Sequence, residues 1–304
     1  MEYILEASAL VKRYRGFTAL NGFSMHIPKG SIYGFVGRNG AGKTTLIRLI
    51  CGLQEPTQGE YTLYGVKNSD SGIIRSRRRM GAVVESPSIY PEMTARENVR
   101  QQFFVLGVSP KKGVDELLEL VGLGDTGNKK VKDFSLGMRQ RLGIAVALSG
   151  DPDFLVLDEP VNGLDPQGII EMRELILKLN REHGITVLIS SHILDELSRL
   201  ATHYGFIDGG RMIREMSADE LEMRCRKCNR IEVSDMKALC DVLKGMSIEY
   251  TIADDTHADI YADVNVTELV TALIEKNCIV NRISERDESL ESFYMKLVGG
   301  EGNV

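Results

Sequence analysis

Three short apolar runs, at residues 31–36, 154–157 and 186–189, stand out in the first two-thirds of the chain. Apolar residues fill each run instead of alternating with polar ones, which is typical of a strand covered by helices on both faces. Stretches with helical spacing separate the runs. The alternation predicts an α/β domain with a largely parallel sheet, whose ligands bind beyond the carboxyl ends of the strands.

The pattern changes after residues 204–213, where Gly209-Gly210 predicts a hairpin and a connecting helix is expected from 218 to about 226. The remaining segments have the order β-α-β-β-α-β, which resembles a small α+β ferredoxin-like unit. We therefore expect two domains, residues 1–218 and 219–304. The expected strands are 231–233, 247–253, 259–262 and 278–284, and the expected helices are 235–244, 266–276 and 289–297.

Composition narrows the class of protein. The net charge of −6 disfavours a dedicated nucleic-acid binder, which usually carries a basic face. No apolar run reaches the roughly 20 residues that span a bilayer, and the first residues lack a signal-peptide pattern. The five scattered cysteines do not form a disulfide framework, so a reducing cytoplasm is expected. Any membrane part must come from another chain.

A phosphate-binding loop follows the first apolar run, in the pattern G-x-x-x-x-G-K-[ST]. A predicted strand precedes it and a predicted helix, residues 44–51, follows it. Glycines let backbone N–H groups turn toward phosphate oxygens, and the helix N-terminus adds positive potential. The lysine should reach the β- and γ-phosphates of ATP, and Thr44 should ligate Mg²⁺. The loop comprises Gly37, Arg38, Asn39, Gly40, Ala41, Gly42, Lys43 and Thr44, with Thr45 next.

Polar residues end the other two apolar runs. Asp158 is placed to hold Mg²⁺, and Glu159 to accept a proton from an attacking water. His192 reaches the same edge, where an imidazole can bond a γ-phosphate oxygen. Taken singly, these residues also fit surface acids in a loop and an ordinary polar histidine; the neighbouring phosphate loop favours catalysis.

Three further segments resemble motifs of the ABC ATPases. Residues 134–141, with Ser135 and Gly137, resemble the signature motif; residues 163–165 resemble the D-loop; and Tyr14 matches the adenine-stacking aromatic, with Phe17 as the other candidate. The resemblance covers about residues 1–215. It implies an ABC cassette: a RecA-like core, a helical subdomain at about 86–150 and an N-terminal antiparallel sheet.

The resemblance also implies a mechanism. Two cassettes pack head-to-tail, each ATP lying between the phosphate loop of one chain and Ser135, Gly137 and Met138 of the other, with Asp165 linking the two sites. ATP favours the closed pair because only that state completes the phosphate contacts. The motion passes to a separate membrane-spanning permease, so the chain is expected on the inner face of the cell membrane.

Some positions depart from the family pattern. Leu136 and Met138 replace a glycine and a glutamine of the signature motif, and Arg38 stands where proline is common. Glu85 replaces a glutamine that senses Mg²⁺ and the attacking water; a carboxylate can still ligate Mg²⁺. Glu85, together with Ser-Leu-Gly-Met at residues 135–138, resembles the bacitracin- and lantibiotic-resistance exporters, which implies export of a peptide antibiotic or other amphiphile. Glu85 as a tolerated substitution is the alternative.

Two other classes of ABC ATPase compete with a transporter subunit. Translation factors resemble paired cassettes with a basic linker, and DNA-repair types carry long coiled coils or zinc modules. The chain has one phosphate loop and no sustained heptad run. The basic run at 75–79 is expected to be a solvated helix face, and the single pair Cys225 and Cys228 lacks the second pair of a zinc site.

Overall fold

The computed structural model describes residues 2–107, 113–225, 228–261, 264–286 and 290–299. The chain divides into two compact units, Met1–Ala218 and Asp219–Val304. Each unit has its own cluster of buried hydrophobic side chains. Within the described residues, no helix is long and apolar enough to cross a membrane.

A six-stranded sheet forms the centre of the first unit. Its strand order is β10-β9-β3-β8-β7-β6, parallel except for β10 at one edge. Strands β3, β7 and β8 are buried at every position, which explains why they are mostly apolar. The bounds are β3 Ile32–Val36, β6 Met80–Val83, β7 Phe154–Asp158, β8 Thr186–Ser191, β9 His203–Asp208 and β10 Arg211–Ser217.

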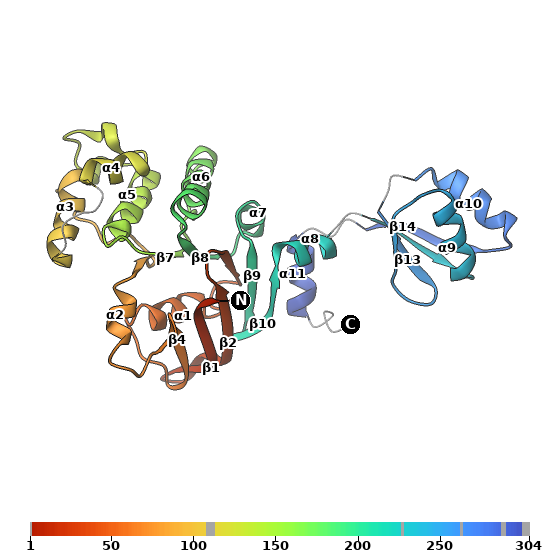
Figure 1. Ribbon diagram of the computed structural model, residues 1–304, viewed down its shortest axis with the longest axis horizontal. Coiled ribbons are helices and arrows are strands. Elements are labelled where there is room, and N and C mark those ends of the chain that lie inside the picture. Colours follow the sequence, from red (N-terminus) through yellow and green to blue (C-terminus); the bar gives the residue numbers. More distant parts are fainter. Residues whose placement is uncertain (1, 108–112, 226–227, 262–263, 287–289, 300–304) are drawn as a thin grey trace. The chain divides into compact units, whose positions relative to one another are not determined.

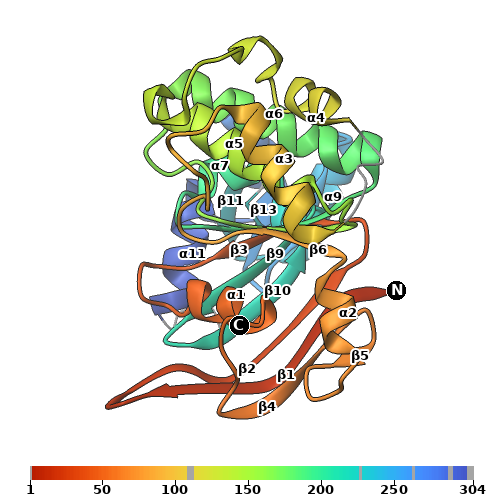
Figure 2. The same ribbon diagram turned by 90° about the vertical axis from the view of Figure 1, so that its left-hand side faces the viewer.

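A second, antiparallel sheet has the order β2-β1-β4-β5. Residues of this sheet, of helix α1 (Lys43–Ile50) and of the six-stranded sheet share one buried cluster. Figure 2 shows α1 and the antiparallel sheet on one side of the six-stranded sheet. The core therefore fixes α1 from both sides. The strands are β1 Tyr3–Tyr14, β2 Phe17–Pro28, β4 Gln58–Leu63 and β5 Val66–Lys67.

Helices cover the other side of the six-stranded sheet (Figures 1 and 2). The helix that begins after Thr94 has a complete capping box: the Thr94 side chain accepts from the N–H of Glu97, and Glu97 accepts from the N–H of Thr94. These helices are α3 Ala95–Leu106, α4 Val114–Leu120, α5 Leu136–Leu148, α6 Pro166–His183 and α7 Leu194–Ser198; α2 Ile73–Arg77 and two 3₁₀ turns, Gly124–Thr126 and Val131–Asp133, complete the unit.

One polar cluster around the buried Tyr33 ties the two sheets together. The hydroxyl of Tyr33 on β3 donates to Glu215 Oε1 on β10 at 2.6 Å, and the backbone N–H of His26 on β2 donates to the same oxygen at 2.8 Å. Burial, reinforced by the Glu215 carboxylate, raises the pKa of Tyr33 well above its usual value. Tyr33 therefore stays a hydrogen-bond donor at physiological pH and holds β10 in place.

The second unit is a four-stranded antiparallel sheet with strand order β12-β13-β11-β14. Helices α9 and α10 pack against it through the unit's own core. The strand expected to start at residue 247 starts at Tyr250, because Ser247 has φ 55° and the Ile248 N–H closes α9 on Leu243. The elements are α8 Ala218–Cys225, β11 Cys228–Val233, α9 Met236–Gly245, β12 Tyr250–Ile252, β13 His257–Ile260, α10 Val266–Glu275, β14 Val280–Arg286 and α11 Leu290–Gly299.

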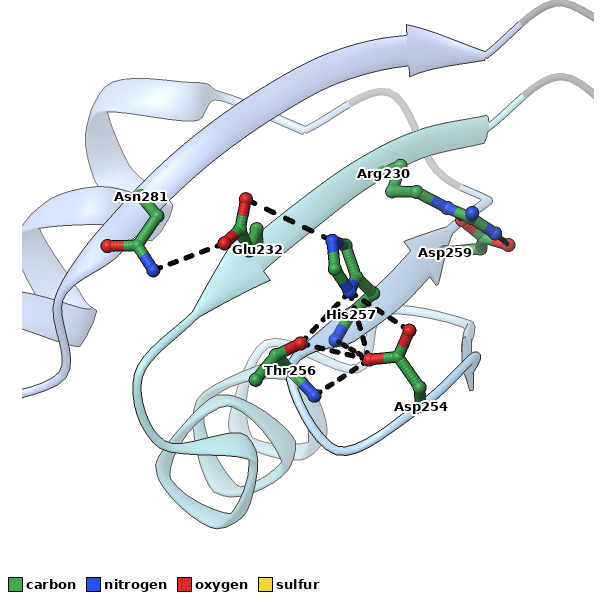
Figure 3. A network of polar contacts seen from close by, with 7 residues as sticks. All are labelled: Arg230, Glu232, Asp254, Thr256, His257, Asp259 and Asn281. Carbon is green, nitrogen blue, oxygen red and sulfur yellow. Dashed lines mark hydrogen bonds and ion pairs between the residues drawn. The ribbon is translucent and has the colours of Figure 1, made fainter.

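Charged residues occupy the face of this sheet opposite the core residues Ala258 and Ile260 (Figure 3). Arg230 on β11 binds Asp259 on β13 through two hydrogen bonds of 2.7 Å. Asp254, in the turn before β13, accepts from the Thr256 and His257 N–H groups at 2.8 Å. Hydrogen bonds from the Thr256 backbone, and then from the His257 side chain, lower the pKa of Asp254.

The bidentate pair predicts a stability effect. Replacing Asp259, whose side chain is only 11% exposed, by alanine leaves the Arg230 guanidinium without its fork partner. Loss of charged hydrogen bonds of this kind costs about 1.5–3 kcal/mol. Amide hydrogens of β11 and β13 should exchange faster in Asp259→Ala, as measured by hydrogen–deuterium exchange. Asp255→Ala, at an exposed carboxylate in the same turn, is the control, and equal exchange in the two variants would refute the prediction.

Candidate functional site

The candidate residues from the sequence follow the ends of four neighbouring parallel strands. The phosphate loop follows β3, His192 follows β8, Glu159 follows β7 and Glu85 lies two residues after β6. These strands are adjacent in the order β3-β8-β7-β6. Their carboxyl ends therefore form one continuous edge, the usual location of a ligand site in such a sheet.

The phosphate loop needs its glycines for steric reasons. A Cβ at Gly37 would lie 2.7 Å from the carbonyl oxygen of Ile207, and one at Gly42, with φ 112°, would lie 2.6 Å from that of Ala19. Only glycine fits between these fixed backbones. The loop borders a cavity of about 300 Å³ lined by Phe17, Ala19, Arg38, Asn39, Gly40, Gly42, Lys43, Thr44, Thr45, Glu159 and Asn162.

The side chain of Lys43 is 6% exposed and is paired within the protein. Its Nζ donates to the carbonyl oxygen of Gly37 at 2.6 Å and to that of Arg38 at 3.3 Å, and lies 3.2 Å from Glu159 Oε1. A buried ammonium requires such compensation. A phosphate entering the loop would compete with the Glu159 carboxylate for this cation.

Glu159 also contacts His192, whose Nδ1 lies 2.6 Å from Glu159 Oε2. A carboxylate only accepts, so Nδ1 carries the proton and Nε2 of a neutral ring is an acceptor. Donation to a phosphate oxygen would require a proton on Nε2. In the neutral tautomer with its proton on Nε2, Nδ1 would no longer donate to Glu159.

The backbone of Glu159 is fixed in an uncommon conformation. Its φ is 52°, and its N–H donates to the carbonyl oxygen of Ser190 at 3.2 Å and to Ser190 Oγ at 3.0 Å. The same hydroxyl donates to Asp158 Oδ1 at 2.5 Å. Ser190 thus holds both acids, and Asp158 is 3% exposed. Sequence reasoning missed Ser190, whose only signal is a small polar residue near the end of a buried strand.

Glu85 lies between two hollows of the surface. It lines a cavity of about 360 Å³ together with Glu159 and Asn162, and also a groove of about 730 Å³ together with Arg48. Its φ is 59°, a conformation that is uncommon for a side chain of this size. Its Oε1 accepts a hydrogen bond from Nη2 of Arg48, in the last turn of α1. Arg48 belongs to no motif, and sequence reasoning did not identify it.

The signature-like segment starts helix α5. Ser135 is its N-cap and accepts from the Met138 N–H at 3.2 Å, which places Gly137 in the first turn. A Cβ on Gly137 would meet only Leu164, at 3.8 Å, so packing within this chain does not require that glycine. Asp165 is the N-cap of α6 and accepts from the Gly168 N–H at 3.0 Å.

The two candidate aromatics for adenine stacking differ in position. Phe17, at the start of β2, is 58% exposed and lines the cavity of the phosphate loop. Tyr14, its partner across the hairpin, is not in that lining and donates its hydroxyl to Gln54 at 2.5 Å. Phe17 therefore lies in the lining of this cavity, and the sequence-based choice of Tyr14 lies outside it.

Comparison with known proteins gives consistent similarities. Residues 20–162 match the family described as ABC transporter. The bacitracin transport ATP-binding protein BcrA of Bacillus licheniformis is 41% identical over 99% of this chain and 99% of its own length. The lantibiotic transport ATP-binding protein SrtF of Streptococcus pyogenes is 43% identical, over 72% of this chain and 93% of its own.

Solved structures are similar to much of the chain. A dimeric ATP-binding cassette in a post-hydrolysis state, bound to ADP and phosphate, superposes with a TM-score of 0.64 at 26% identity. The match covers 70% of this chain and 98% of that cassette. The fold predicted from the sequence, an ABC cassette with an α/β core, is therefore confirmed.

The shape of the loop predicts the effect of one methyl group. Gly42→Ala should weaken ATP binding tenfold or more, because the new Cβ must displace the backbone at Ala19 and with it the loop; tenfold is about 1.4 kcal/mol. Titration with a fluorescent ATP analogue measures this. Gly30→Ala is the matched control, since Gly30 also has positive φ, 79°, but no atom within 4 Å of a new Cβ. Equal affinities of the two variants would contradict the steric account.

Proposed function

The chain belongs to the ABC transporter ATP-binding proteins, and we propose that it powers the export of a peptide antibiotic or similar amphiphile. It is the ATP-binding and ATP-hydrolysing subunit of a transporter rather than a non-transport ABC ATPase. The observation that supports the proposed cargo is the near full-length similarity to a bacitracin transport protein. The chain of contacts from Lys43 through Glu159 to His192 supports the proposed site of hydrolysis.

ATP is held at the phosphate loop in this proposal. N–H groups of residues 37–45 and the Lys43 ammonium bind the phosphates, and Phe17 stacks on the adenine. Mg²⁺ fits the oxygen donors at this edge: Thr44 lines the cavity, and Asp158, the last residue of β7, directly precedes Glu159 in the same lining. When bound, Mg²⁺ neutralises charge that develops on the phosphates. Glu85, which follows β6 at the same edge, would be a third oxygen ligand when it is not paired with Arg48.

Glu159 is the general base of the proposed reaction. Once a phosphate engages Lys43, the Glu159 carboxylate gives up that ion pair and is placed to accept a proton from water. His192 then donates from Nε2 to a γ-phosphate oxygen. In the structure, the Glu159 side chain is held by Lys43 and His192. Binding of ATP therefore releases the base at the same time.

A second cassette completes each site. Ser135, Gly137 and Met138 at the N-terminus of α5 would bind the γ-phosphate held by the partner chain, where first-turn N–H groups favour an anion. The glycine at position 137, which packing within this chain does not require, fits close approach of another molecule. Asp165, at the start of α6, would link the two sites.

The membrane-spanning part is a separate permease chain in this proposal. Residues 86–150 form the helical subdomain, and the groove that contains Glu85, Arg78 and Leu106 receives a cytoplasmic segment of the permease. The chain is then peripheral on the inner face of the cell membrane. Residues 1–218 are the ATPase domain, and residues 219–304 are an accessory domain that modulates closure of the pair.

Replacing the base tests the reaction. Glu159→Gln should bind ATP yet lose about 10²- to 10⁴-fold in turnover, because the amide cannot accept a proton from water. The variant should accumulate as an ATP-bound dimer, seen by size-exclusion chromatography with light scattering. Glu182→Gln, at an exposed position of α6, should behave like the unmodified protein. Normal hydrolysis by Glu159→Gln would remove Glu159 from the role of base.

The adenine contact gives a second test. Phe17→Ala should weaken ATP binding by about 1–3 kcal/mol, the usual contribution of stacking between a base and an aromatic ring. Tyr14→Ala removes an aromatic ring from the same hairpin outside the cavity and should weaken ATP binding much less. Calorimetric titration of both variants with ATP and a non-hydrolysable analogue measures the two losses of affinity. A larger loss for Tyr14→Ala would restore the sequence-based assignment.

A further inference from the structure

We propose that Arg48 is a positioning residue for Glu85, holding its carboxylate in the groove, away from the nucleotide. This inference rests on the proposed ATP hydrolysis at the same edge. The contact that carries it is the ion pair between the Arg48 guanidinium and Glu85 Oε1. Neither residue forms part of the chain of contacts from Lys43 to His192.

The positions of the two side chains show toward which hollow the ion pair holds the Glu85 carboxylate. Glu85 lines both the cavity shared with Glu159 and the large groove, whereas Arg48 lines only the groove. The hydrogen bond to Arg48 therefore holds the Glu85 carboxylate on the side of the groove. Released from Arg48, the same side chain faces the cavity that contains Glu159.

Arg48 and Glu85 are fixed to two different parts of the cassette. Arg48 is in the last turn of α1, the helix that begins with Lys43, and its carbonyl oxygen accepts the N–H groups of Leu53 and Gln54. Glu85 has a positive φ just beyond β6. One end of the pair is thus fixed to the phosphate-binding helix, and the other to the segment that leads into the helical subdomain.

Charge explains why such a pair is needed here. A carboxylate at position 85 adds negative charge at an edge that already has Asp158 and Glu159 and that binds a polyphosphate. A glutamine at that position would need no counter-ion. The guanidinium of Arg48 balances the extra charge while the carboxylate is in the groove.

The pair is also weak enough to open. The Arg48 and Glu85 side chains are 36% and 55% exposed, and half-exposed ion pairs contribute little and exchange partners readily. A divalent cation at Thr44 and Asp158, or a permease segment that contacts Arg48 in the groove, can therefore take one partner. Arg48 competes with the cation for a single carboxylate.

Cation binding tests this competition without relying on turnover. In a hydrolysis-deficient Glu159→Gln background with ATP, Mn²⁺ is titrated as a paramagnetic substitute for Mg²⁺ and followed by electron paramagnetic resonance. Removing the competitor in Arg48→Gln should tighten Mn²⁺ binding about two- to fivefold, the range expected for a half-exposed ion pair. Arg48→Lys, which keeps the charge, should restore most of the original affinity.

Two matched variants separate positioning from general electrostatics. In a Glu85→Gln background the change at Arg48 should have no effect on Mn²⁺ affinity, and Arg78→Gln, in the same groove, should have none in either background. With Glu159 intact, Arg48→Gln should shift the Mg²⁺ dependence of hydrolysis and leave the KM for ATP unchanged.

The outcomes distinguish this inference from the proposed function. If Arg48→Gln changes Mn²⁺ affinity equally with Glu85 present and in the Glu85→Gln background, or changes nothing with Glu85 present, Arg48 does not act through Glu85 and the inference is overturned. If every variant fails to bind ATP while circular dichroism shows it folded, the proposed function itself fails. If only Arg48→Gln loses its structure, Arg48→Lys is the deciding variant. Its single ammonium group should still hold Glu85 in place of the Arg48 guanidinium.

Discussion

The site depends on the order in which four parallel strands lie side by side. Residues as far apart in sequence as Lys43 and His192 meet because β3, β8, β7 and β6 are neighbours and end at one edge. Strands β3, β7 and β8 are buried along their whole length, so a shift in register would expose core residues. The core therefore sets the position of each strand end. The polar residue that follows the strand is fixed in position as a result.

Charge compensation at this edge makes the site responsive to its ligand. Lys43 is nearly buried and needs negative partners, and Glu159 provides one. A phosphate that replaces Glu159 satisfies the lysine and at the same time alters the hydrogen bond to His192. Exchange of partners among Lys43, Glu159 and His192 would thus prepare the proposed base without a large backbone movement.

The sequence predicted the cassette well because its motifs follow strands with unbroken apolar runs. The strands expected at residues 154–157 and 186–189 are β7 and β8. The family pattern pointed to Tyr14 ahead of Phe17. Both flank one hairpin tip, and only the three-dimensional arrangement places Phe17 alone of the two in the cavity lining. Ser190 and Arg48 lacked any pattern, because their roles come from contacts between elements distant in sequence.

Glu85 illustrates how a departure from a family pattern should be interpreted. Taken alone, a carboxylate in place of an amide beside a polyphosphate is either a new ligand for Mg²⁺ or a tolerated defect. The structure adds Arg48, which forms an ion pair with Glu85, and both residues line the groove. In our proposal the carboxylate becomes available to a cation only when Arg48 finds another partner. Since the groove is where we place the permease, competition for Glu85 would connect cation binding with the membrane partner.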